Sequence, residues 1–118
     1  MQSGGIGDGE YRPVISTPPE PWFKGTGFTQ TSVLRGLVGY EYDVITDGCK
    51  TPPLTHLFHF SGHNISNADS VRYTAPSGAR VFSSGSIRFA TALDPLSHRS
   101  DPRMQRFMRN AVDDLLRP

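Results

Sequence analysis

The sequence predicts an α+β fold, in which four or five strands form a small, mostly antiparallel or mixed sheet and one C-terminal helix packs against it. Three observations support this prediction. Gly and Pro are concentrated near the N-terminus, alternating apolar residues begin near residue 37, and a helical apolar stripe ends the chain. With 118 residues, the chain is long enough for one domain.

The N-terminal part reads as a connector. Residues 1–21 are rich in Gly and then in Pro, ending in the run Pro18, Pro19, Glu20, Pro21. Proline at this density disfavours both helices and central strands. We therefore expect an extended Gly/Pro-rich connector over residues 1–21 and a folded region over residues 22–118.

Several short segments have the composition of strands. Segment 37–45 alternates between two faces, and segment 54–60 is apolar and aromatic after a Pro-Pro pair. Segments 70–74 and 79–83 predict a hairpin, because the link between them has Pro76 early and Gly78 late. Segment 87–92 is expected to form another short strand.

The C-terminal helix has the clearest signal. Asp101 is a favourable N-cap and Pro102 occupies the first helical position. Apolar residues then recur with helical spacing, so one side of the helix is expected to pack on the sheet. These residues are Met104, Phe107, Met108, Ala111, Val112, Leu115 and Leu116.

Charge and cysteine content exclude several classes of function. A net charge of +1 provides no strongly basic field for nucleic acid. No apolar run is long enough to span a membrane, and no signal peptide is visible. The single cysteine, Cys49, fits the reducing cytoplasm, which is the expected location. We expect no nucleic-acid and no membrane partner.

Glu41 and Asp43 are the candidate catalytic residues. On the predicted strand 37–45 they lie two positions apart and share a face, opposite Tyr40 and Tyr42. Two neighbouring carboxylates, if buried, raise the pKa of one of them, which suits acid–base catalysis. The alternatives are a solvated strand face or a structural ion pair with an arginine.

Three histidines, His56, His59 and His63, raise the question of a metal site. On a regular strand, the odd offset between His56 and His59 sends their side chains to opposite faces. Gly62 is expected to interrupt the strand before His63. We therefore expect solvent-facing or hydrogen-bonded histidines, with no cofactor or metal held by this chain. A small stand-alone enzyme using His59, His63 and Glu41 is a further alternative.

An ordered set of motifs resembles the C-terminal region of the N,N-dimethylformamidase large (beta) subunit family. The motifs lie in segments 22–28, 36–43, 68–73 and 78–87 and at the helix start, 101–103, and the resemblance covers about residues 20–117. It implies that the chain is the end of a larger α/β domain similar to class I glutamine amidotransferases. Complete family members are implied to hydrolyse small amides at an iron held by two Tyr and one Glu from upstream segments.

The resemblance also implies a role for the carboxylates. Glu41 resembles the family's acidic residue that supports a catalytic histidine, and Asp43 accompanies it. The iron-ligand motif is absent, so we expect a partial member that is inactive alone. Its partners would be the rest of the large subunit, a partner chain, a small subunit or a second copy. The alternative function is a non-catalytic structural or protein-interaction domain.

Overall fold

The structure is a computed structural model that describes residues 9–39, 43–45, 52–62 and 67–118. It confirms the α+β prediction. Five strands form a sheet in the order β2-β1-β3-β4-β5, and every neighbouring pair is antiparallel. The elements are β1 (Gly9–Pro13), the 3₁₀ helix η1 (Pro21–Phe23), β2 (Leu34–Val38), β3 (Thr55–Phe60), β4 (Ala68–Thr74), β5 (Arg80–Ser83), the 3₁₀ helix η2 (Ile87–Ala92) and α1 (Pro102–Leu115).

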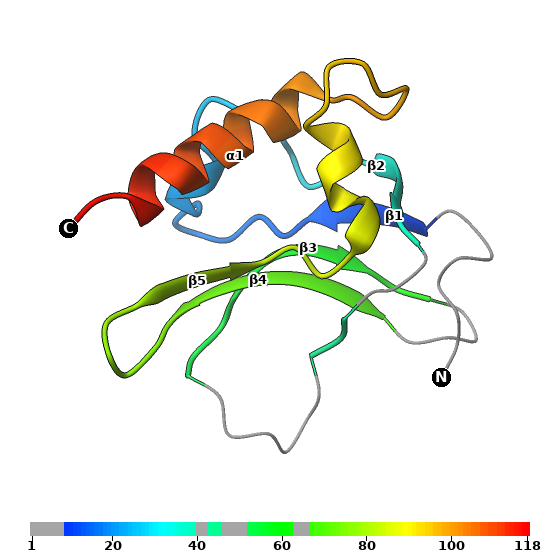
Figure 1. Ribbon diagram of the computed structural model, residues 1–118. Coiled ribbons are helices and arrows are strands. Elements are labelled where there is room, and N and C mark those ends of the chain that lie inside the picture. Colours follow the sequence, from blue (N-terminus) through cyan, green and yellow to red (C-terminus); the bar gives the residue numbers. More distant parts are fainter. Residues whose placement is uncertain (1–8, 40–42, 46–51, 63–66) are drawn as a thin grey trace.

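The core lies between the sheet and the helix α1, which crosses one face of the sheet (Figure 1). Aromatic rings fill this space: the ring centroids of Phe58 and Phe107 are 5.0 Å apart, and those of Phe23 and Phe107 are 5.2 Å apart. Both contacts are tilted or edge-on, which is the favourable arrangement for aromatic pairs. None of the helices that the structure describes has the length and hydropathy of a membrane span.

The predicted helix is confirmed, with Asp101 as its N-cap and Pro102 in its first turn. The Asp101 side chain accepts a hydrogen bond from the backbone N–H of Arg103 at 2.9 Å. Met104, Phe107 and Ala111 are fully buried, as the stripe predicts. The buried face is narrower than expected, because Val112 is 42% and Leu116 is 78% exposed.

The predicted hairpin is also confirmed, as β4 and β5. Its turn is closed by hydrogen bonds from Gly78 N to Ala75 O at 2.9 Å and from Ala75 N to Ala79 O at 2.7 Å. Gly78 has a φ of +89°, a conformation that favours glycine.

The expectation of an extended connector over residues 1–21 needs correction at residues 9–13. These residues form β1, which pairs with β2 on one side and with β3 on the other. Tyr11 has no exposed surface. The prediction failed because Gly9 and Pro13 delimit a strand of only five residues, too short to show a period.

Two other strand predictions need correction. β2 ends at Val38, so residues 37–45 do not form one strand, and Asp43 lies in a segment without regular secondary structure. Ile87–Ala92 is the 3₁₀ helix η2, whose N-cap, Ser86, accepts a hydrogen bond from Arg88 N. A capping serine before the segment favours the helical turn over the strand that its apolar residues predict.

Candidate functional site

An irregularity in β3 places two histidines on the same face of the sheet. His56 is opposite Val71 of β4, but Phe58 is opposite Ser70, so Leu57 is an extra residue in the ladder. One extra residue reverses the alternation of side chains beyond it. The prediction that His56 and His59 face opposite sides is therefore wrong.

Asp69 of β4 binds both histidines. His56 Nε2 and His59 Nδ1 each lie 2.7 Å from Asp69 Oδ1. The other carboxylate oxygen, Oδ2, accepts a hydrogen bond from Ile45 N at 3.1 Å. The residue is only 6% exposed, so one buried carboxylate organises the whole cluster. We refer to His56, His59 and Asp69 as the His–Asp cluster.

The carboxylate of Asp69 is held in its charged form. Burial by itself raises its pKa, but the hydrogen bonds from His59, from the Ile45 amide and from His56 outweigh burial, and the pKa is lowered. The two imidazoles are less covered, with 39% and 36% of their side chains exposed. The cluster thus joins a buried charge to two rings that solvent or a ligand can reach.

The far nitrogen of His59 also has a partner. His59 Nε2 lies 3.0 Å from the hydroxyl oxygen of Ser61, which is on the same chain segment just after β3. Because Asp69 occupies one ring nitrogen and Ser61 the other, the orientation of the His59 ring is fixed.

The loop after β5 packs closely against the backbone of Asp69. A Cβ atom on Gly85 would lie 1.9 Å from the Asp69 carbonyl oxygen and 2.7 Å from the Tyr11 hydroxyl. The same loop accepts a hydrogen bond from Asp43 N at Gly85 O, and the Asp43 carbonyl accepts one from Asp69 N. Segment 43–45, β4 and this loop are therefore packed into one unit.

The predicted site residues fare differently. Glu41 and His63 lie outside the described residues. Asp43 is exposed, and its backbone joins it directly to Asp69. Asp69 was missed as a site residue. The available signal was a single acidic residue directly before the predicted strand 70–74, but its pairing with both histidines depends on the irregularity at Leu57.

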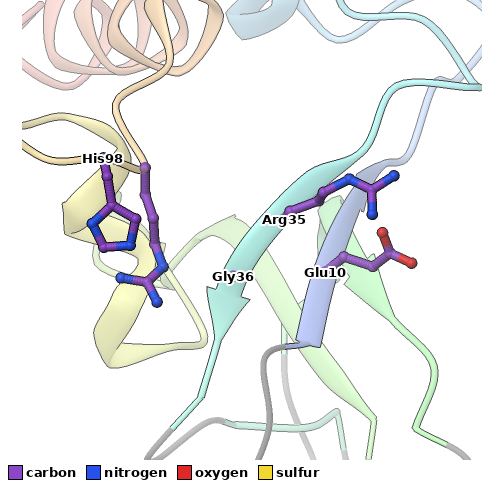
Figure 2. A pocket seen from close by; sticks show the side chains of 5 residues that line it. Glu10, Arg35, Gly36 and His98 are labelled. Carbon is purple, nitrogen blue, oxygen red and sulfur yellow. The ribbon is translucent and has the colours of Figure 1, made fainter.

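A second hollow, of about 440 Å³, lies beside β2 and is lined by Glu10, Arg35, Gly36, His98 and Arg99. Figure 2 shows His98 on one side of Gly36 and the side chains of Arg35 and Glu10 close together on the other. Arg35 and His98 are exposed, and the lining carries charges of both signs. This surface lacks a buried ionised group, so the His–Asp cluster is the better candidate site.

Tyr11 is unsuited to the iron-ligand role that the resemblance assigns to tyrosines of upstream segments. Tyr11 is fully buried, and its hydroxyl donates a hydrogen bond to Ser84 O at 2.9 Å. Burial, together with the charges of Asp69 and Asp43, raises the pKa of Tyr11, which disfavours the phenolate that an iron ligand needs. Tyr40 and Tyr42 lie outside the described residues.

Comparison with known families gives one match. The family described as N,N-dimethylformamidase beta subunit-like, C-terminal, matches the chain over residues 1–105. The matched region includes all five strands and the complete His–Asp cluster, and it ends within α1. No curated protein and no solved structure matches the chain.

Proposed function

The chain belongs to the N,N-dimethylformamidase beta subunit-like C-terminal family, and from this membership we propose that it is the C-terminal portion of an amide hydrolase. In this proposal the chain contributes groups to an active site that other residues complete. It would lie at the end of a larger α/β domain similar to class I glutamine amidotransferases.

The observation that carries the proposal is the buried, ionised carboxylate of Asp69, which holds two half-exposed imidazoles. Amide hydrolysis requires groups that orient ligands or transfer protons, and carboxylate-backed imidazoles are common among them. An ionised group this well buried and this well satisfied is typical of a functional site.

Glu41 and Asp43 keep their place in the proposal as supporting carboxylates. The described residues on either side of Glu41 both bind the loop at residues 85–86: Gly39 N donates to Ser86 Oγ at 3.4 Å, and Asp43 N donates to Gly85 O at 2.8 Å. This is the loop that supports Asp69, so the flanks of Glu41 and the His–Asp cluster share one scaffold.

The proposal is tested by measuring dimethylamine release from N,N-dimethylformamide. The isolated chain with added iron is expected to give none, because the resemblance implies that the two Tyr and one Glu iron ligands come from upstream segments. Turnover by the isolated chain would overturn the claim that its site is incomplete.

A second arm joins the chain to the iron-bearing portion of a family member and measures the same release. Glu41→Gln and Asp69→Asn are expected to lower the rate of the assembled enzyme, with Glu10→Gln, on the exposed side of β1, as the control. If the assembled enzyme is active and neither substitution changes its rate, the chain has a structural or protein-interaction role instead.

A further inference from the structure

The His–Asp cluster has the composition of a metal site. His56 Nε2, His59 Nδ1 and an Asp69 oxygen all lie within 4.8 Å of one another, and no other group of three or more such residues gathers in this way within the part of the chain that the structure describes. Imidazole nitrogen suits zinc, copper, iron and nickel, and carboxylate oxygen completes the set. Two histidines and one carboxylate are a recurring ligand set for catalytic metals.

Two of the three separations, those from Asp69 Oδ1 to each histidine nitrogen, are close to what an ion needs. With metal–ligand bonds of about 2.0–2.1 Å, neighbouring ligand atoms of a tetrahedral site are about 3.3 Å apart. Asp69 Oδ1 is now 2.7 Å from each histidine nitrogen. Inserting an ion therefore requires a separation larger by about 0.6 Å, which small rotations of the two half-exposed imidazoles provide.

Hydrogen-bond partners from outside the ligand set already hold the ligands in one orientation. Ser61 Oγ is 3.0 Å from His59 Nε2, which leaves Nδ1 facing the cluster. Ile45 N binds Asp69 Oδ2 at 3.1 Å, which leaves Oδ1 facing the cluster. Such hydrogen bonds from outside the ligand set are a regular feature of metal sites.

The strands supply rigidity, and the exposed rings supply access. His59 and Asp69 are directly opposite each other in the β3–β4 ladder, so their backbones cannot move apart without breaking the sheet. The imidazoles are more than a third exposed, so an ion there would keep a coordination position open to solvent. Open positions distinguish catalytic from structural zinc sites.

We propose that His56, His59 and Asp69 bind one divalent transition-metal ion of the zinc class, with Ser61 and Ile45 positioning the ligands. This site is separate from the tyrosine-ligated iron site implied for complete family members. It does not depend on amide hydrolysis, because it is a property of this chain alone.

The test is calorimetric titration of the chelator-treated chain with Zn²⁺, together with the visible absorption of bound Co²⁺. One ion per chain is expected, and His56→Ala and His59→Ala are expected to weaken binding by about tenfold or more. Ser61→Ala should weaken it by a smaller factor, since it removes only an outer partner. His98→Ala, an exposed histidine that lines the second hollow, is the matched control and should bind as the unmodified chain does.

The titration results either support or overturn the proposed site. Saturable binding that both histidine substitutions weaken, and that His98→Ala leaves unchanged, supports the site. The proposal is overturned if the chain takes up neither ion, or if His56→Ala and His59→Ala bind as tightly as the unmodified chain. Circular dichroism of each variant checks its fold, and the exposure of both imidazoles predicts that these variants remain folded.

Discussion

Gly85 is the residue on which the backbone of the site depends most closely. It has a φ of +72°, and a Cβ atom there would lie 1.9 Å from the Asp69 carbonyl oxygen, which is backbone and cannot swing away. Glycine is therefore required for two separate reasons, its conformation and its contact with β4.

Substitutions at Gly85 and at a control glycine separate the conformational cost from the steric cost. Gly85→Ala is expected to destabilise the chain by more than about 3 kcal/mol, because strain of about 1–2 kcal/mol is added to a direct steric clash. Gly78→Ala is the matched control: its φ is also positive, at +89°, but a Cβ there meets nothing within 4 Å. It should cost only the strain. Urea unfolding measures both, and equal losses would show that the Gly85 contact is absent.

Among single residues, the sequence predicted the role of those whose partners lie next to them in the chain. Asp101 was identified as a cap because the residues that it caps follow it directly. Asp69 was not identified, because its role depends on His56 and His59, which lie 13 and 10 positions earlier. Their shared face results from one extra residue in a strand, which the alternation of residue types does not show.

Among the elements, α1 carries a carboxylate whose charge contributes to stability. Burial alone raises the pKa of Asp101, but hydrogen bonds from the Arg103 side chain and backbone outweigh burial, and the pKa is lowered. A lowered folded-state pKa means that this contribution is complete above the unfolded pKa of about 3.9 and is lost as the pH falls through the folded value.

Asp101→Asn keeps a capping side chain and removes the charge. It is expected to cost about 1 kcal/mol or less at neutral pH and to lose less additional stability than the unmodified chain below about pH 4. Asp101→Ser, an uncharged cap, should show the same smaller loss of unfolding free energy at acid pH. Unfolding free energies measured across this pH range test the prediction, and an acid limb as steep as that of the unmodified chain would contradict it.

A contact between elements joins the residue before η1, Glu20, to β4. The Arg72 guanidinium donates to both Glu20 carboxylate oxygens at 2.8 Å and lies 5.1 Å from the Trp22 ring centroid. Glu20 is only 7% exposed. Glu20→Gln leaves a partly buried cation without its counter-charge, so a loss of about 2–3 kcal/mol is expected after allowing for the quarter of Arg72 that solvent reaches.

The pair Glu10–Arg12 provides the comparison. Its atoms are 3.7 Å apart and its side chains are 38% and 56% exposed, so Glu10→Gln should cost less than about 1 kcal/mol. Chemical denaturation of both variants measures the difference. Losses of similar size would mean that the Glu20–Arg72 pair does not tie the two segments together.

The elements that were predicted well have local signals. A cap followed by proline marks α1, and a Pro–Gly turn marks the β4–β5 hairpin. Assignments failed where tertiary contacts decide. η2 carries apolar residues like a strand, yet none of the described strands pairs with it, and β2 ends at Val38 although alternating residues continue. Propensity is a weak guide at such positions.

In the molecule as a whole, β1 is the strand that joins the two halves of the sheet. It lies between β2 and β3, and the fully buried Tyr11 packs with its ring 5.9 Å from that of Phe58. A sequence pattern cannot reveal this position, because residues 9–13 pair with strands that lie much later in the chain.

Substitutions at two adjacent residues test whether β1 is a central strand of the sheet. Tyr11→Ala is expected to cost about 3–5 kcal/mol, because it removes an aromatic side chain from the core. Arg12→Ala, at the exposed neighbouring position, should change stability by no more than about 0.5 kcal/mol. Thermal unfolding distinguishes them; small, equal effects would mean that residues 9–13 are the connector that their composition suggested.

The sheet as a whole brings the His–Asp cluster together, and nitrogen-15 NMR of the histidine rings measures directly whether Asp69 holds both imidazoles. An ionised carboxylate only accepts hydrogen bonds, so the ring nitrogen facing it must carry the proton. In the metal-free chain, an uncharged His56 ring is expected to carry its proton on Nε2, and an uncharged His59 ring on Nδ1. A proton on Nε2 of His59, or two rings that exchange freely between tautomers, would contradict the cluster.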